Sequence, residues 1–220
     1  MKIDSCRTLT DRINASISAV NLLINSLDGK KTLGHVEFLD SDGALGILFR
    51  FTRTLSSGDE KLLLECAERL SAVISVTEPD SSKRVLNRDV TVERIIGGDP
   101  LDLYVRSGGL KIRCLPSSFV QINSLLNEKM VATVTSMLNT GRDSRILDLF
   151  CGIGNFTLPL AKSGATVTGV DIVPLMIRQA RENAECENLE NVSFEVADLS
   201  EPFEKMAWAR AEYDAAGLGP

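Results

Sequence analysis

The chain has 220 residues, of which 44% are hydrophobic and 25% are charged, as is usual for a folded globular protein. Its net charge of −6 gives no overall basic surplus of the kind that nucleic-acid binders usually carry. No run of about 18 apolar residues occurs, so we expect no membrane span. The polar start lacks the apolar stretch of a secretory signal, which predicts a cytoplasmic protein.

The first half of the chain predicts a mixture of helices and short strands. Apolar residues at three- and four-residue steps over 7–27 indicate an amphipathic helix that ends at Gly29. Ser57 and Glu60 have the spacing of a capping box before a second helix at about 59–73. Strands are expected around a hairpin at 35–40 and 44–51, and then at 92–98, 101–107 and 110–116. These elements predict a small α+β domain.

After Pro116 strands and helices alternate strictly. Apolar strands separated by helices are typical of a parallel sheet covered on both faces. Helices are expected at 124–139, 155–164 and 174–188, with a polar helix ending near 210, and strands at 144–150, 165–171, 192–198 and 213–218. We place the domain boundary near residue 118, so that the chain divides into domains 1–118 and 119–220.

Charge is distributed unevenly between these two predicted domains. Residues 1–118 contain 16 basic and 16 acidic side chains, whereas residues 119–220 contain 8 and 14. Solvated loop charges are the simpler interpretation of the basic groups, and RNA contacts are the alternative. These groups are Lys30 with Lys31, Arg50 with Arg53, and Lys83 and Arg84 with Arg88.

The stretch 146–161, ILDLFCGIGNFTLPLA, joins a strand to a helix through a glycine-rich turn. In open α/β sheets ligands bind beyond the carboxyl ends of the strands, where Gly152 and Gly154 let backbone approach a ligand. The pattern is D-x-x-x-G-x-G and not the G-x-G-x-x-G of dinucleotide sites. Asp148 at the base of the turn would repel a pyrophosphate but suits a ligand that carries a positive charge.

Two further acids follow the next two strands. Asp171 is placed to accept both hydroxyls of a ribose, and Asp198 to accept a hydrogen bond from an adenine amino group. A helix cap is the alternative role for either acid alone. Together with the glycines, these strand-end acids favour S-adenosyl-L-methionine over NAD.

Several segments together resemble the RNA uracil-C5 methyltransferases, and in particular their bacterial 23S ribosomal RNA branch. They include FVQIN at 119–123, the glycine turn itself, and LGHVEFLDSDGALGILFR in the first half. The resemblance covers essentially the whole chain. It implies a Rossmann-like methyltransferase fold, incomplete at the C-terminus, after a small α+β central domain. As cofactor contacts it implies Gln121, Phe150, Asn155, Asp171 and Asp198, beside Gly152 and Gly154.

The resemblance also bears on the chemistry of the chain. Methylating C5 of uracil requires a cysteine that adds to C6 and a base that removes the C5 proton. In the family these residues follow an Asp-Pro-x-Arg motif after the fourth strand, whereas this chain reads GLGP at 217–220. We therefore expect an internal fragment with a cofactor site, no catalytic residue, and only weak binding to 23S RNA.

The cysteines fit that expectation. Four cysteines hold an iron–sulfur cluster in the ribosomal branch, and Cys6 falls at the position of the fourth, so we expect an orphan ligand and no cluster. The scattered set, which contains no C-x-x-C pair, predicts neither disulfides nor a metal site. Cys151 is interpreted as a packing residue whose thiol faces the cofactor, and His35 as structural. The full set is Cys6, Cys66, Cys114, Cys151 and Cys186.

Other functions remain open from sequence. The tRNA-directed uracil-C5 methyltransferases are the nearest alternative to the 23S enzymes. A cofactor-binding or scaffold module without catalysis is an alternative from another class, and a small-molecule methyltransferase is a third. The oligomeric state and the target nucleotide do not follow from the residues.

Overall fold

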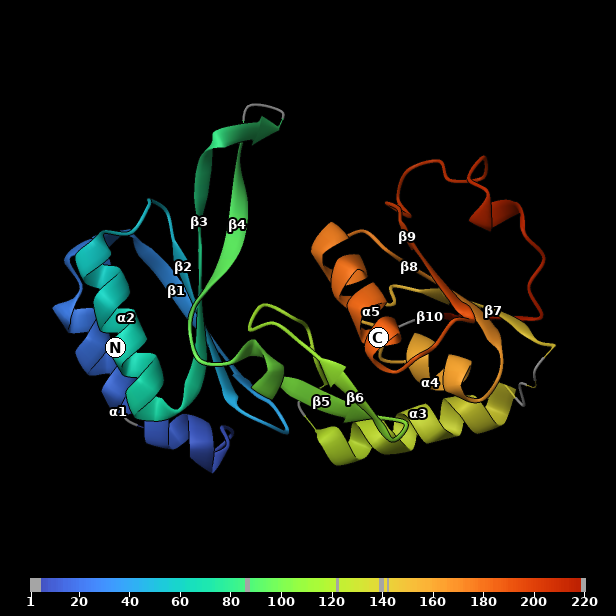
Figure 1. The fold of residues 1–220 in the computed structure, drawn as a ribbon, viewed down its shortest axis with the longest axis horizontal. Helices are drawn as coiled ribbons and strands as arrows, with labels where there is room; N and C mark the ends of the chain where they lie inside the picture. Colours follow the sequence, from blue (N-terminus) through green and yellow to red (C-terminus); the bar gives the residue numbers. More distant parts are fainter. Residues whose placement is uncertain (1–4, 86–87, 122, 139–140, 142, 219–220) are drawn as a thin grey trace. The chain divides into compact units, whose positions relative to one another are not determined.

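The computed structural model describes residues 5–85, 88–121, 123–138, 141 and 143–218 (Figure 1). The chain forms two compact units, the first made of residues 1–104 and 115–117 and the second of residues 105–114 and 118–220. The segment 105–114, which was predicted to belong to the first domain, is part of the second unit. None of the helices in the described part of the chain has both the length and the apolar character needed to cross a bilayer.

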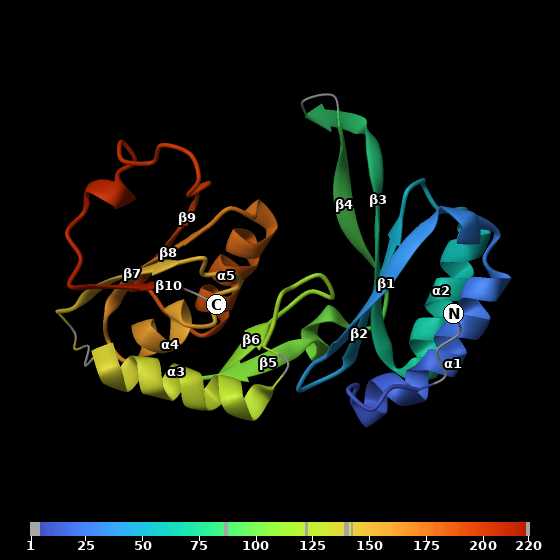
Figure 2. The same ribbon diagram turned by 180° about the vertical axis from the view of Figure 1, so that it is seen from behind.

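The first unit is a four-stranded sheet with two helices on one face (Figures 1 and 2). The strand order is β1-β2-β3-β4, with β2 and β3 parallel and the other neighbours antiparallel. The strands are β1 (Leu33–Asp40), β2 (Leu45–Phe51), β3 (Ala72–Val85) and β4 (Arg88–Gly97), and the helices are α1 (Asp11–Ser26) and α2 (Ser57–Leu70).

The apolar faces of α1 and α2 form the core of this unit. Ile13, Val20 and Leu23 of α1 pack against β2 residues such as Ile47 and Phe49, as the predicted helical spacing requires. The N-cap of α2 is Ser56, whose side chain accepts the Asp59 N–H at 3.1 Å. The capping box predicted from Ser57 and Glu60 was therefore wrong by one residue.

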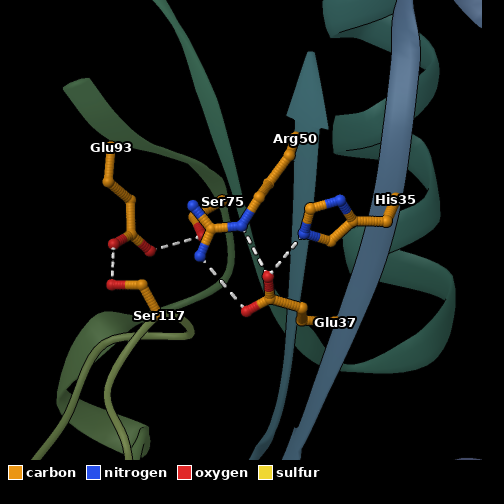
Figure 3. Close-up of polar contacts among 6 residues, drawn as sticks. All are labelled: His35, Glu37, Arg50, Ser75, Glu93 and Ser117. Atoms are coloured by element: carbon orange, nitrogen blue, oxygen red, sulfur yellow. Dashed lines mark hydrogen bonds and ion pairs between the residues drawn. The ribbon is translucent and has the colours of Figure 1, made fainter. Parts of the chain in front are cut away.

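The face of this sheet turned away from the helices carries a polar cluster (Figure 3). Arg50 donates from Nε to Glu37 Oε1 at 2.5 Å and from Nη2 to Oε2 at 3.2 Å, which lowers the pKa of the Glu37 carboxyl. His35 Nε2 lies 2.9 Å from Glu37 Oε1. Glu93 accepts from the hydroxyl groups of Ser75 and Ser117. His35 thus takes part in a local polar network at the surface of β1.

The second unit contains the parallel sheet that the sequence predicts. Its strand order is β10-β7-β8-β9, and every neighbouring pair is parallel. The strands are β7 (Arg145–Leu149), β8 (Thr166–Asp171), β9 (Val192–Val196) and β10 (Ala215–Leu218). The helices are α3 (Ser124–Leu138), α4 (Thr157–Lys162) and α5 (Pro174–Cys186), and a hairpin of β5 (Tyr104–Ser107) and β6 (Leu110–Arg113) precedes them.

The two faces of this sheet are covered differently. Ile146 and Val167 pack with residues of α3 and α4. On the other face Val170 packs against Trp208 and Phe203 from the segment between β9 and β10. That segment forms turns and one short 3-10 helix, Trp208–Arg210. The polar helix predicted to end near residue 210 was therefore wrong, and an irregular segment covers this face.

Candidate cofactor site

The glycine turn lies where the strand order changes direction. Residues 150–156 connect β7 to α4, and β7 has β8 on one side and β10 on the other. The chain continues from β7 to β8 and then to β9, and only its last strand, β10, pairs with the other side of β7, so the strand order reverses at β7. In α/β sheets ligands bind beyond the carboxyl ends of the strands at such a reversal, which is where the glycine turn lies.

The backbone of this turn is in conformations that favour glycine. Gly152 has φ 54° and Gly154 has φ 97°. A Cβ on Gly154 would lie 2.9 Å from Leu158 Cγ, so this glycine is needed for packing against α4. A Cβ on Gly152 would meet no atom within 4 Å. The space beside Gly152 is thus open to a ligand that approaches the backbone.

Phe150, the first residue of the turn, shares the left-handed conformation with φ 59°. This backbone region costs a residue with a Cβ about 1–2 kcal/mol. No core packing offsets this cost, since Phe150 is 50% exposed at the end of β7. An exposed aromatic ring beside the open space at Gly152 suits contact with an apolar part of a ligand.

Asp171 ties the end of β8 to the glycine turn. Its Oδ2 accepts the Gly152 N–H at 3.0 Å, and its Oδ1 accepts the Val173 N–H at 2.9 Å. Each carboxylate oxygen can accept more than one hydrogen bond, so the side chain keeps capacity for ligand hydroxyls. Asp171 therefore fits a double role, as an anchor of the turn and as a ligand acceptor.

Asp148 is buried beneath the turn, with 2% of its surface exposed. Its Oδ2 accepts a hydrogen bond from Thr157 Oγ1 at 2.5 Å. Burial raises the pKa of the Asp148 carboxyl to about 6, and the nearby Asp171 charge adds to this, while the Thr157 hydrogen bonds oppose it. Through Thr157, the first residue of α4, Asp148 joins β7 to the helix that follows the turn.

Three other residues were predicted to contact the cofactor, namely Asp198, Asn155 and Gln121. Asp198 follows β9 and is exposed, and its Oδ1 accepts from the N–H and the hydroxyl of Ser200 at 2.9 and 2.6 Å. These bonds close a local turn and do not cap a helix, which was the alternative role weighed for this acid. The Asn155 side-chain amide pairs with that of Asn127, each donating to the other at 2.9 Å. Gln121 is half-buried just before α3. Their contacts with a cofactor stay predictions.

Cys151 is a packing residue, but its thiol faces the sheet. The side chain is 5% exposed, and its Sγ lies 2.9 Å from the Cβ position that Gly169 of β8 leaves empty. Burial, with the charges of Asp148 and Asp171, raises the pKa of the Cys151 thiol. A buried protonated thiol is a poor nucleophile.

Cys6 Sγ lies 3.0 Å from Thr8 Oγ1, and no metal-binding group of three or more side chains occurs among the described residues.

Two buried polar residues that support the turn were not predicted from the sequence. Asn127 and Asn183 are 4% and 0% exposed, although each lies on a predicted amphipathic helix. Asn183 falls in the helical phase of Ile177, Ala180 and Ala184, which form the buried face of α5. An asparagine on the buried face of a predicted helix could have indicated a structural role, because a buried amide must find hydrogen-bond partners.

Comparisons with known proteins agree with this geometry. Residues 141–216 match a family described as a methyltransferase domain. The 23S rRNA (uracil(1939)-C(5))-methyltransferase RlmD of Shewanella sediminis is 40% identical over 209 residues, or 94% of this chain. The RlmD of Haemophilus influenzae is 34% identical over 99% of it. The chain belongs to the RNA uracil-C5 methyltransferases.

Within that family the chain spans less than half of its curated relatives, 45% of the Shewanella protein and 47% of the Haemophilus protein. A solved uracil-C5 methyltransferase supports the fold across both units. It is the Pyrococcus abyssi tRNA (uracil-54, C5)-methyltransferase in complex with S-adenosyl-L-homocysteine, with a TM-score of 0.67 and 21% identity. The match covers 98% of this chain and 53% of that one. The predicted Rossmann-like fold after an α+β domain is therefore confirmed.

Proposed function

We propose that this chain binds S-adenosyl-L-methionine and is part of an enzyme that methylates C5 of uracil in 23S ribosomal RNA. The observation that carries the proposal is the open glycine turn pinned by Asp171, in a chain 40% identical to an RlmD. RlmD proteins are named for 23S RNA, which favours that substrate over tRNA. A cytoplasmic location stays a prediction from the sequence.

The residues present fit this cofactor. Asp171 would hold the ribose hydroxyls and Asp198 the adenine amino group, while Gln121 and Asn155 would hold the amino-acid end. When bound, the cofactor supplies an electrophilic methyl group. The chain's own contribution is to orient that group and to keep the turn in one shape, since positioning accounts for a large part of catalysis. We assign no catalytic residue among the described cysteines.

Isothermal titration calorimetry with S-adenosyl-L-methionine tests the cofactor assignment. The Asp171→Ala variant loses hydrogen bonds to a charged acceptor, which costs about 1.5–3 kcal/mol. Affinity should therefore fall roughly 10- to 150-fold. Asp214→Ala is the matched control, because Asp214 Oδ2 also accepts a backbone N–H, that of Arg145 at 2.7 Å, at the opposite end of the sheet.

Two results would argue against the assignment. Equal affinity in the wild type and the Asp171 variant would remove that residue from the site. Preference for NAD over S-adenosyl-L-methionine in a competition titration would remove the cofactor itself.

RNA binding is the second part of the proposal, and it is expected to be weak and salt-dependent. Arg50, one of the basic candidates, is engaged with Glu37. Lys30 Nζ donates to Asn25 O at 2.9 Å but is otherwise at the surface, as is Arg53. The side chains of Lys83, Arg84 and Arg88 lie outside the described residues.

Filter binding with 23S RNA fragments at rising salt tests this part, with tRNA as competitor. Charge reversal at Lys30 and Lys31 should weaken binding and flatten its salt dependence. Tight, salt-insensitive binding that maps to residues 119–220 would contradict the expectation, and equal competition by tRNA would remove the preference for 23S RNA.

A further inference from the structure

The glycine turn is held by three buried polar side chains that lie outside it. Asn183 Nδ2 donates to Ile153 O at 3.2 Å, and Ser107 Oγ donates to Asn155 O at 2.7 Å. Asn127 forms the reciprocal amide pair with the Asn155 side chain. Asn183 and Ser107 are 0% exposed and Asn127 is 4% exposed. All three belong to the second unit.

Asn183 is the centre of this arrangement, because its amide nitrogen and its amide oxygen are both hydrogen-bonded within the protein. Its Oδ1 accepts the Arg113 N–H at 3.0 Å, and its Nδ2 donates to Arg113 O at 2.9 Å as well as to Ile153 O. The Asn183 side chain thus bonds both backbone groups of Arg113, the last residue of β6, as a neighbouring strand would. An amide side chain can do this because it carries two N–H donors and an acceptor oxygen on one group.

The hairpin formed by β5 and β6 brings the other contacts. Ser107 is the last residue of β5, and the turn that follows has Gly108 and Gly109 at φ 56° and 71°. A Cβ on Gly108 would lie 2.6 Å from Pro159 of α4, so the hairpin packs tightly at the start of that helix. The hairpin is therefore linked to the turn directly by Ser107 and indirectly by Asn183, which bonds both Arg113 of β6 and Ile153 of the turn.

We propose that Asn183, Ser107 and Asn127 are positioning residues that hold the glycine turn in its cofactor-binding shape before the cofactor arrives. The inference rests on the proposed function, since it names what supports the same site. Three residues of the turn have positive φ, so without these bonds the backbone would have other conformations open to it. Holding one conformation in advance raises affinity, because the cost of ordering is not met at binding.

The test compares Asn183→Asp with Asn191→Asp in the 220-residue chain. Asn191 Nδ2 donates to Ala161 O at 2.8 Å and Ala165 O at 2.6 Å, near the amino ends of the strands. Both changes place a carboxylate against two carbonyl oxygens, so both should lower the melting temperature. Only Asn183→Asp should raise the dissociation constant for S-adenosyl-L-homocysteine, at least tenfold, whereas Asn191→Asp stays within about twofold. A similar rise in both variants, or none in Asn183→Asp, would overturn the proposal.

A second measurement needs no cofactor and separates this proposal from the cofactor assignment. Amide hydrogen exchange in the ligand-free protein should be faster at residues 152–156 in Asn183→Asp than in Asn191→Asp. Unchanged exchange there would overturn the positioning role even if the cofactor binds. Failure of the wild type to bind would instead overturn the cofactor assignment. Ser107→Ala, which removes a single donor, should raise the dissociation constant a few-fold and serves if Asn183→Asp does not fold.

Discussion

Replacing Asp148 by asparagine should stabilise the second unit at neutral pH. The folded protein raises the Asp148 pKa from 3.8 to about 6, a difference of roughly 2 units at about 1.36 kcal/mol each. The stability linked to this proton, about 3 kcal/mol, is fully present below pH 3.8 and is lost as pH rises through 6. Asparagine is neutral throughout and removes the cost of a buried charge.

Urea unfolding followed by Trp208 fluorescence measures this effect, because Trp208 is the only tryptophan and is buried in the second unit. At pH 7.5 Asp148→Asn should be more stable than the wild type by up to about 3 kcal/mol, less any hydrogen bonding lost at Thr157. At pH 5 the advantage should be smaller by about 1.4 kcal/mol, because there the carboxyl of the folded wild type is largely protonated.

Thr157 offers an independent check on the cause of the raised Asp148 pKa. Thr157 hydrogen bonds lower the Asp148 pKa, so Thr157→Val should move the titration midpoint of the carboxyl, followed by NMR, above its wild-type value. A stability difference between wild type and Asp148→Asn that stays constant from pH 5 to 7.5 would refute the assignment of the raised pKa to Asp148.

Two further predictions concern the glycine turn. Gly152→Ala should cost about 1–2 kcal/mol of stability in urea unfolding, because its φ is 54°; Gly141→Ala, with equally open space for a Cβ but no positive φ, should be nearly neutral, and equal costs would contradict the strain argument. Iodoacetamide should label the exposed Cys186 much faster than the buried Cys151, whose thiol pKa is raised, as read by mass spectrometry of peptides. Equal labelling rates would mean that the turn opens readily.

The parallel sheet was predictable because its signals are local. Each of β7, β8 and β9 is short, contains buried apolar residues and has an acid within two residues of its end, and α5 opens with Pro174. The approach of Asp171 to Gly152 follows from this pattern, because parallel strands end at one edge of the sheet. The sequence alone could thus predict that an acid lies beside the turn. In the structure the Gly152 nitrogen and Asp171 Oδ2 are 3.0 Å apart.

Other features depend on partners that are distant in sequence. β3 was not predicted. Its apolar first half follows α2 directly and its second half is polar, so the sequence shows neither the alternation of a strand nor the spacing of a helix. It forms because β2 and β4 pair with it on either side. The segment before β10 reads as a polar helix, yet Trp208 and Phe203 pack on the sheet instead. Asn183 finds its partner Arg113 across 70 residues, beyond the reach of periodicity.

The position of β10 beside β7 has a consequence for synthesis on the ribosome. Arg145, at the start of β7, donates its N–H to Asp214, which is 69 residues later and just before β10. At roughly 5–20 residues per second, about 3–14 seconds pass between the two. During that interval one edge of β7 has no strand to pair with, and an open edge invites pairing with other chains. We expect the nascent chain to need protection at that edge until β10 has emerged.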